Sequence, residues 1–257
     1  MTRIFITGAS SGLGVELARA YAAPGNVVAI TARRREELEA VARTLPGETV
    51  VYAVDVTDHA GLANAAADFI ARFGAPDVVI ANAGISAGTL TEFQEDLPSS
   101  DKIFRVNVVG LFATFSPFVA AMRASGGGKL VGIASVAGIR GLPGSGGYCA
   151  SKAAAISYLE ALRGEMRPYG IGVVTLLPGY IRTPLTAKNP YAMPFLMEPD
   201  DAARRMRRVI DRGSSYAVVP WQMGIVARLM RLVPNWLFDR VVAGKARKPR
   251  AVEGQKT

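Results

Sequence analysis

The sequence predicts an α/β protein in which a doubly wound parallel sheet of about seven strands carries helices on both faces. Short β-branched apolar runs recur along the chain, and a segment of helical character separates each from the next. The apolar runs lack polar alternation, which is typical of parallel strands buried on both faces. No linker, repeat or low-complexity segment interrupts this order, so residues 1–257 are expected to form one domain.

Each strand is expected where an apolar run lies, at residues 4–6, 27–30, 50–54, 78–80, 130–133, 173–177 and 217–219. Helices are expected between them, at residues 16–21, 35–45, 60–73, 100–123, 150–167 and 202–212. Two longer loops, 85–98 and 183–199, follow strands at the edge where such a sheet binds its ligand. The apolar cluster around Tyr191 and Phe195 fits either a loop packed on the core or a lid over a lipophilic substrate.

Composition excludes several classes of protein. With 257 residues, 50% hydrophobic and 20% charged, the chain has the composition of an ordinary globular protein. The single Cys149 allows no intrachain disulfide, and the presence of only one histidine, His59, argues against structural zinc and against a Ser-His-Asp or Cys-His hydrolase. No run reaches about 18 consecutive apolar residues, and a strand follows Met1 almost directly, so a cytoplasmic protein is expected. No metal site is expected, because the chain has no cluster of Cys and His residues.

The formal net charge of +9 would attract nucleic acid, an acidic membrane surface or a phosphorylated cofactor. The excess lies in three clusters, at residues 33–35, 204–208 and 245–250. No aromatic side chains interleave with the first two clusters, as base stacking would require, so no nucleic-acid partner is expected.

A glycine-rich turn follows the first strand and opens the first helix. It contains Gly8, Gly12 and Gly14 in a Gly-x-x-x-Gly-x-Gly spacing, with Ser10, Ser11 and Leu13 between them. Glycines allow a phosphate to approach the backbone closely, and the amino end of a helix attracts it. The alternative is a turn rich in small residues, but the position between a strand and a helix favours binding of a dinucleotide.

The end of the second strand indicates which dinucleotide is bound. An acidic residue there would accept the 2′-hydroxyl of NAD, whereas this segment reads Ala32-Arg33-Arg34. A guanidinium group suits a 2′-phosphate, so Arg33 favours NADP(H) over NAD(H).

Tyr148 and Lys152 lie four residues apart, on one face of an expected helix. A free tyrosine has a pKa of about 10, and a neighbouring ammonium group favours its phenolate, so the pair suits proton exchange. Ser135, at the end of the fifth strand, places a hydroxyl at the same edge of the sheet.

Together these features resemble the short-chain dehydrogenase/reductase family, from Thr7 to about Val219. The resemblance implies a Rossmann-type fold and a hydride transfer between the nicotinamide of NADP(H) and a carbonyl or alcohol. It adds Asn107 to Ser135, Tyr148 and Lys152 as catalytic residues. Its further cofactor-binding positions match Asp55 and Val56, Asn82, Ala83 and Gly84, and Pro178, Gly179, Ile181 and Thr183.

The resemblance also implies a role for each catalytic residue. Tyr148 would give a proton to a carbonyl oxygen that Ser135 hydrogen-bonds. Lys152 would bind the nicotinamide ribose and lower the pKa of Tyr148, while Asn107 would hold a water that relays protons through Lys152. One position departs from the pattern of NADP-preferring members, because Ser11 stands where many of them carry a basic residue.

Residues 221–257 form an amphipathic and basic extension beyond the family's shared region, with two helical pieces around Pro234. This extension fits a helix that closes the substrate pocket, a subunit interface, or peripheral contact with an acidic membrane. The resemblance implies a homodimer or homotetramer.

The expected substrate is a lipophilic carbonyl or alcohol. The alternatives are reduction of a 3-oxoacyl thioester, with a landing surface at Arg204–Arg208 for its carrier, and a catalytically silent NADP-binding sensor or scaffold.

Overall fold

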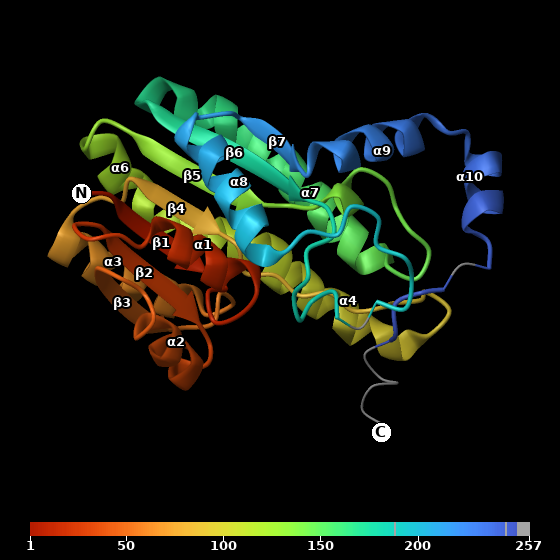
Figure 1. The fold of residues 1–257 in the computed structure, drawn as a ribbon, viewed down its shortest axis with the longest axis horizontal. Helices are drawn as coiled ribbons and strands as arrows, with labels where there is room; N and C mark the ends of the chain where they lie inside the picture. Colours follow the sequence, from red (N-terminus) through yellow and green to blue (C-terminus); the bar gives the residue numbers. More distant parts are fainter. Residues whose placement is uncertain (188, 245, 251–257) are drawn as a thin grey trace.

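The computed structural model describes residues 1–187, 189–244 and 246–250, which form a seven-stranded sheet flanked by helices (Figure 1). All neighbouring strands are parallel, in the order β3-β2-β1-β4-β5-β6-β7. The predicted doubly wound sheet is therefore confirmed. The strands are β1 (Arg3–Thr7), β2 (Val27–Ala32), β3 (Glu48–Ala53), β4 (Val78–Ala81), β5 (Gly128–Ile133), β6 (Ile171–Pro178) and β7 (Tyr216–Val219).

The two faces of the sheet bury separate cores, because successive strand residues point to opposite faces. Ile6 packs with Leu17 and Met206 in one core, whereas its neighbour Phe5 packs with Phe69 in the other. The first face is covered by α1 (Leu13–Tyr21), α2 (Arg35–Ala42) and α8 (Pro199–Asp211). The second is covered by α3 (His59–Phe73), α5 (Gly110–Phe115), α6 (Val119–Ala124) and α7 (Gly146–Met166).

The helix expected at residues 100–123 is longer and interrupted. The helical run Gln94–Ala124 comprises η1 (Gln94–Asp96), α4 (Leu97–Phe104), a π-helical turn η2 (Arg105–Val109), α5, η3 (Ser116–Phe118) and α6. By length and composition this run could cross a membrane. However, its Leu111, Phe115 and Met122 side chains are buried in the core on the second face of the sheet, as expected of a core helix.

The ends of other helices also differ from the sequence prediction. α1 begins at Leu13 rather than at residue 16, because the glycine-rich turn leads directly into its first turn. α2 ends at Ala42 rather than at residue 45. α7 begins at Gly146 rather than at residue 150, which places Tyr148 inside its first turn.

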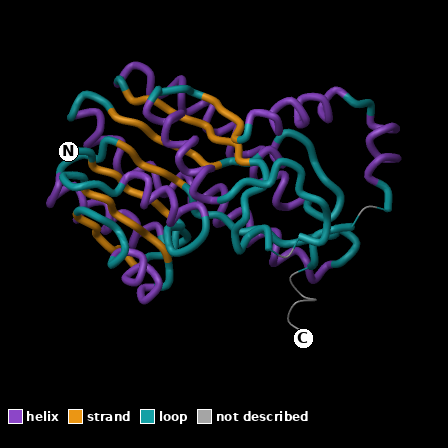
Figure 2. The backbone as a smooth tube through the Cα atoms, in the orientation of Figure 1, coloured by secondary structure: helices purple, strands orange, loops and turns teal. Residues whose placement is uncertain are grey.

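Beyond β7 the chain forms α9 (Trp221–Leu232) and α10 (Asn235–Val242), the two helical pieces predicted around Pro234. Figure 1 shows that the chain then turns back from α10 toward α4. The loops that follow the strands gather at one end of the sheet (Figure 2). The predicted site residues lie at this end.

Candidate active site

The glycine-rich turn is held tightly against the loop after β4. Gly8 has a φ of +69°, and a Cβ placed on it would lie 2.7 Å from the Cα of Ala83. The Asn82 amide donates to the backbone oxygens of Thr7 and Gly8, each at 3.1 Å. A Cβ on Gly14 would collide with the Gly8 carbonyl oxygen, and one on Gly12 would lie 3.2 Å from the Thr183 side chain. Glycine is therefore required at these three positions of the turn, 8, 12 and 14.

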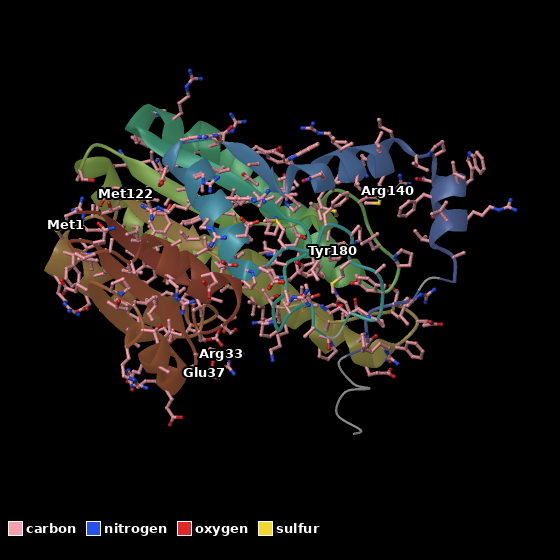
Figure 3. All side chains as sticks on the ribbon, in the orientation of Figure 1. Met1, Arg33, Glu37, Met122, Arg140 and Tyr180 are labelled. Carbon is pink, nitrogen blue, oxygen red and sulfur yellow. The ribbon has the colours of Figure 1, made fainter. Side chains whose placement is uncertain are left out.

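A cavity of about 580 Å³ extends from this turn to the loops beyond β5 and β6. Figure 3 shows Arg33 beside α2, with Tyr180 further along among the loops. Every residue expected to bind the cofactor lines the cavity: Gly8, Ser10, Ser11, Gly12, Leu13, Gly14, Arg33, Asp55, Val56, Asn82, Ala83, Gly84, Tyr148, Lys152, Pro178, Gly179, Ile181 and Thr183. Residues from five different loops and from helix α7 thus meet around a single space.

Arg33 lies at the end of β2 and is exposed. Its Nε lies 3.6 Å from Oδ2 of Asp55, and the other oxygen of that carboxylate accepts hydrogen bonds from Thr57 at 2.9 and 2.8 Å. Within the described parts of the chain, one long ion-pair contact holds the guanidinium group at the cavity wall. It therefore has donors left for a further anion.

Tyr148 and Ser135 both line the cavity. Ser135 follows the end of β5 by two residues in an extended conformation, and its hydroxyl accepts a hydrogen bond from the amide of Ala137 at 3.1 Å. Burial raises the pKa of Tyr148 to about 12, while a hydrogen bond with Ser135 opposes this shift. In this structure burial outweighs that hydrogen bond, so the phenol is protonated at neutral pH.

Lys152 lies one helical turn beyond Tyr148 on α7 and is buried. Its Nζ donates to the Ile133 carbonyl oxygen at 2.8 Å and lies 5.9 Å from the centre of the Tyr148 ring. Burial lowers the pKa of Lys152 to about 8. Burial thus moves the two pKa values apart, from the ordinary 10.0 and 10.5 to about 12 for Tyr148 and about 8 for Lys152.

Asn107 differs from the other predicted residues because it lies behind the cavity and does not line it. It belongs to the π-helical turn η2, and such turns are frequent at functional sites. Its Oδ1 accepts from the Ile85 amide at 2.8 Å, while its Nδ2 donates to the Ile85 oxygen and to Ser151, each at 3.0 Å. Both amide hydrogens are used within the protein, and the water relay stays a prediction.

Ser151 is a positioning residue that the sequence did not single out. It is fully buried, accepts the Asn107 amide and donates to the Tyr148 carbonyl oxygen at 2.8 Å. A chain of hydrogen bonds thus joins the loop after β4, the π-helical turn and the first turn of α7. No motif marks such a serine, because the helix face it occupies also fits an ordinary core position.

The far end of the cavity is mainly apolar. Tyr180 and Tyr191 line it, with their rings edge to face at 6.3 Å, and Met223 and Met230 of α9 complete the wall. The loop 183–199 therefore combines both interpretations, because Tyr191 lines the cavity whereas Met197 is buried in the core.

The geometry fits a dinucleotide cofactor. A glycine cradle that any Cβ would fill, an open guanidinium group and a buried Tyr/Lys pair share one elongated cavity. Across the described ranges, no group of three or more His, Cys, Asp and Glu side chains could hold a metal ion.

Comparisons with known proteins agree with this geometry. Residues 2–193 match the family model described as short chain dehydrogenase. An uncharacterized oxidoreductase of Myxococcus xanthus is 37% identical over 237 residues, which cover 91% of this chain and 93% of that protein.

Two solved structures are also similar. A short-chain dehydrogenase from Streptomyces avermitilis has a TM-score of 0.77 at 29% identity and covers 96% of this chain and 99% of its own. The 3-ketoacyl-(acyl-carrier-protein) reductase of Brucella melitensis, solved with NADH, has a TM-score of 0.76 at 27% identity, over 84% and 94% of the two chains.

Proposed function

This chain belongs to the short-chain dehydrogenase/reductase family, and from that premise we propose an NADPH-dependent oxidoreductase that acts on a lipophilic carbonyl or the corresponding alcohol. The family membership establishes an NAD(P)-dependent enzyme acting on CH–OH groups. The observation that carries the proposal is the convergence of Ser135, Tyr148 and Lys152 on the cavity that holds the glycine cradle.

The cavity lining from the glycine cradle to Thr183 would hold NADPH, which when bound would supply the hydride for the carbonyl carbon. Tyr148 gives its phenolic proton to the carbonyl oxygen, and Ser135 hydrogen-bonds that oxygen as its negative charge develops. Charged Lys152 stabilises the phenolate that forms. Asn107 and Ser151 fix the first turn of α7 and so position Tyr148. In the oxidation the phenolate takes the proton back.

The preference for NADP(H) rests on Arg33. Its guanidinium group lines the cavity, where it would bind a 2′-phosphate by donating charge-assisted hydrogen bonds to it. Asp55 is the competing influence, because its carboxylate already lies beside Arg33. The structurally similar Brucella reductase was solved with NADH, so direct measurement has to decide between the two cofactors.

The similarity to that reductase supports 3-oxoacyl thioester reduction as a second candidate. The positively charged face of α8, which would receive the acyl carrier, gives less support to this second candidate. Arg204 pairs with Asp200 at 2.7 Å, Arg205 pairs with Asp201 at 2.9 Å, and Arg207 contacts Asp211 at 3.4 Å. These ion pairs neutralise much of the charge that would attract an acidic carrier.

One experiment tests both cofactor and chemistry. NADPH and NADH binding is measured by fluorescence titration for the wild type, Arg33→Ala and Tyr148→Phe, and NADPH oxidation is then followed with ketones, aldehydes and 3-oxoacyl thioesters. We expect Arg33→Ala to weaken NADPH binding about tenfold or more and to leave NADH binding unchanged. Tyr148→Phe should keep NADPH binding and lower kcat about a hundredfold or more.

Arg35→Ala is the matched control, because Arg35 pairs with Glu39 and does not line the cavity. Equal affinity of the wild type for both cofactors would contradict the NADP(H) preference. Tight binding without turnover of any carbonyl would favour the sensor or scaffold instead.

A further inference from the structure

The last described segment, residues 246–250, lies across the loops that enclose the substrate end of the cavity. Figure 1 shows this part of the chain returning from α10 toward α4. The Gly88 amide donates to the Pro249 oxygen at 3.0 Å, and Arg247 packs against Gly144. The segment therefore connects the loops after β4 and β5, which are far apart in sequence.

A buried ion pair anchors this segment. Nε of Arg250 lies 2.8 Å from Oδ2 of Asp96, and the two side chains are only 11% and 3% exposed. Arg250 also contacts Glu95 at 3.1 Å and lies over the Phe93 ring at 3.7 Å. Removing a partner from such a pair is costly, so the segment is held firmly in place.

The anchor places Lys248 in the wall of the cavity. Its Nζ donates to the Ser86 hydroxyl and to the Leu185 carbonyl oxygen, each at 3.0 Å. These bonds use two of the three donors of an ammonium group and leave the third available. Lys248 is half-buried, and this burial lowers the pKa of its ammonium group.

Ser86, which accepts a hydrogen bond from Lys248, lies close in sequence to the residues beside Lys152. Ser86 follows Gly84 by two residues, and a Cβ on Gly84 would lie 3.5 Å from Nζ of Lys152. Lys248 thus contacts the same loop after β4 that passes beside the catalytic lysine at Gly84. Its second partner, Leu185, belongs to the loop after β6 that also carries Thr183.

The cavity wall has an unbalanced charge at this end. Among the described residues that line the cavity, Asp55 is the only carboxylate, and it lies beside Arg33 at the other end. Arg140 also lines the substrate end, but it is engaged with the backbone oxygens of Met230 and Val233. Tyrosine, leucine and methionine side chains line this cavity together with the cations Lys248, Arg140 and Lys102.

We propose that Lys248 determines substrate specificity by binding a carboxylate, so that the preferred substrates are lipophilic carbonyl compounds that carry an acidic group. This inference rests on the proposed function and adds the substrate class. An anion in this position would replace the water lost from the ammonium group with a charge-assisted hydrogen bond. A neutral compound of the same shape would leave the cation without such a partner.

The test uses matched probes that differ only in charge. Binding of 4-oxo-4-phenylbutanoate, 5-oxo-5-phenylpentanoate and their methyl esters to the NADPH complex of the full chain is measured by calorimetry, and their reduction is measured in parallel. We expect the wild type to bind at least one acid about tenfold or more tightly than its ester, and to show the same preference in kcat/KM.

Three variants identify the source of this preference. Lys248→Met should bring acid and ester to equal affinity, and Lys248→Arg should retain the preference. Arg240→Met removes one positive charge on exposed α10, away from the cavity, and should change neither value. Unchanged NADPH affinity in Lys248→Met would show that the substrate's anion, rather than a phosphate of the cofactor, is the partner.

The proposal fails if the acids and esters bind the wild type equally, if neither acid binds, or if Lys248→Met keeps the preference. It also fails if that variant weakens NADPH instead. Failure of the proposed function has a different signature, because acid binding would then depend on Lys248 although no carbonyl is reduced.

Discussion

The ammonium group of Lys152 lies in the protein interior, only 4% exposed, and Ile133 supplies its hydrogen-bond acceptor. Its pKa of about 8 in the folded chain lies below the ordinary value of 10.5, and burial is the cause. Below pH 8 the group is protonated in both the folded and unfolded states, so folding carries the whole cost of burying the charge. Between pH 8 and 10.5 the unfolded state binds more protons, and stability rises with pH.

We therefore expect Lys152→Met to be more stable than the wild type at pH 7, and the gap to close as the pH rises to about 10.5. The shift from 10.5 to about 8 corresponds to a change in that gap of roughly 3 kcal/mol. Urea unfolding of both proteins at pH 7.5, 8.5 and 9.5 measures it. A gap that stays constant over this range would show that Lys152 titrates normally in the folded protein.

At the residue scale, the sequence singled out Tyr148 and Lys152 by their spacing and Ser135 by its position after a strand. The structure places all three side chains on one cavity. What the spacing could not supply is the balance of electrostatic effects. The sequence favours a phenolate beside an ammonium group, whereas burial raises the pKa of Tyr148 to about 12. Ser151 and Lys248 were unpredictable, because their partners come from distant segments that only the fold brings together.

At the scale of elements, exposed apolar side chains lie on the helical run that precedes β5. Leu97 is 70% exposed, and Phe104 and Val109 are also exposed although their neighbours pack on the sheet. Within this run, the ring of Phe112 on α5 contacts the ring of Tyr158 on α7, with ring centres 3.9 Å apart. We propose that this face forms the interface of the homodimer or homotetramer that the resemblance implies.

The double variant Phe104→Glu/Val109→Glu should dissociate such an oligomer, because an interface core does not accept unpaired carboxylates. Light scattering after size exclusion should show the wild type at a multiple of 27.2 kDa and the variant at 27.2 kDa. Leu232→Glu, at an apolar and more exposed position on α9, is the control and should keep the oligomer. A monomeric wild type at all concentrations would contradict the proposal.

The elements themselves were predictable where the apolar pattern is long and regular. All seven expected strands occur, because their β-branched runs are buried on both faces of the sheet. The π-helical turn at Asn107 was not predictable, since no local pattern distinguishes it from the continuous helix around it. The return of residues 246–250 across the cavity also depends on contacts with Asp96 and Gly88, to which no sequence spacing points.

At the scale of the whole molecule, the net charge of +9 is distributed unevenly. The cationic cluster of α8 is compensated by ion pairs, whereas α9 and α10 expose Arg228, Arg231 and Arg240. The same helices expose Trp221, Ile225, Leu229, Leu232 and Trp236, with Leu232 78% and Trp236 70% exposed. Meanwhile, Met223 and Met230 face inward and line the cavity. The helices thus close the substrate end and keep an apolar, basic outer face.

We propose that this outer face makes a peripheral contact with acidic membranes, because tryptophan, leucine and arginine side chains suit the boundary between headgroups and acyl chains. The full chain should float with vesicles containing phosphatidylglycerol, remain soluble with pure phosphatidylcholine, and dissociate as salt is added.

Leu232→Glu/Trp236→Glu should lower the bound fraction about tenfold or more, since each apolar side chain contributes about 1.5–3 kcal/mol when fully buried. Leu97→Glu, on the opposite helical run, should bind as the wild type does. NADPH affinity measured in parallel shows that the variants are folded. Equal recovery of the wild type and the double variant in the soluble fraction would exclude this contact and leave the outer face of α9 and α10 to a protein partner.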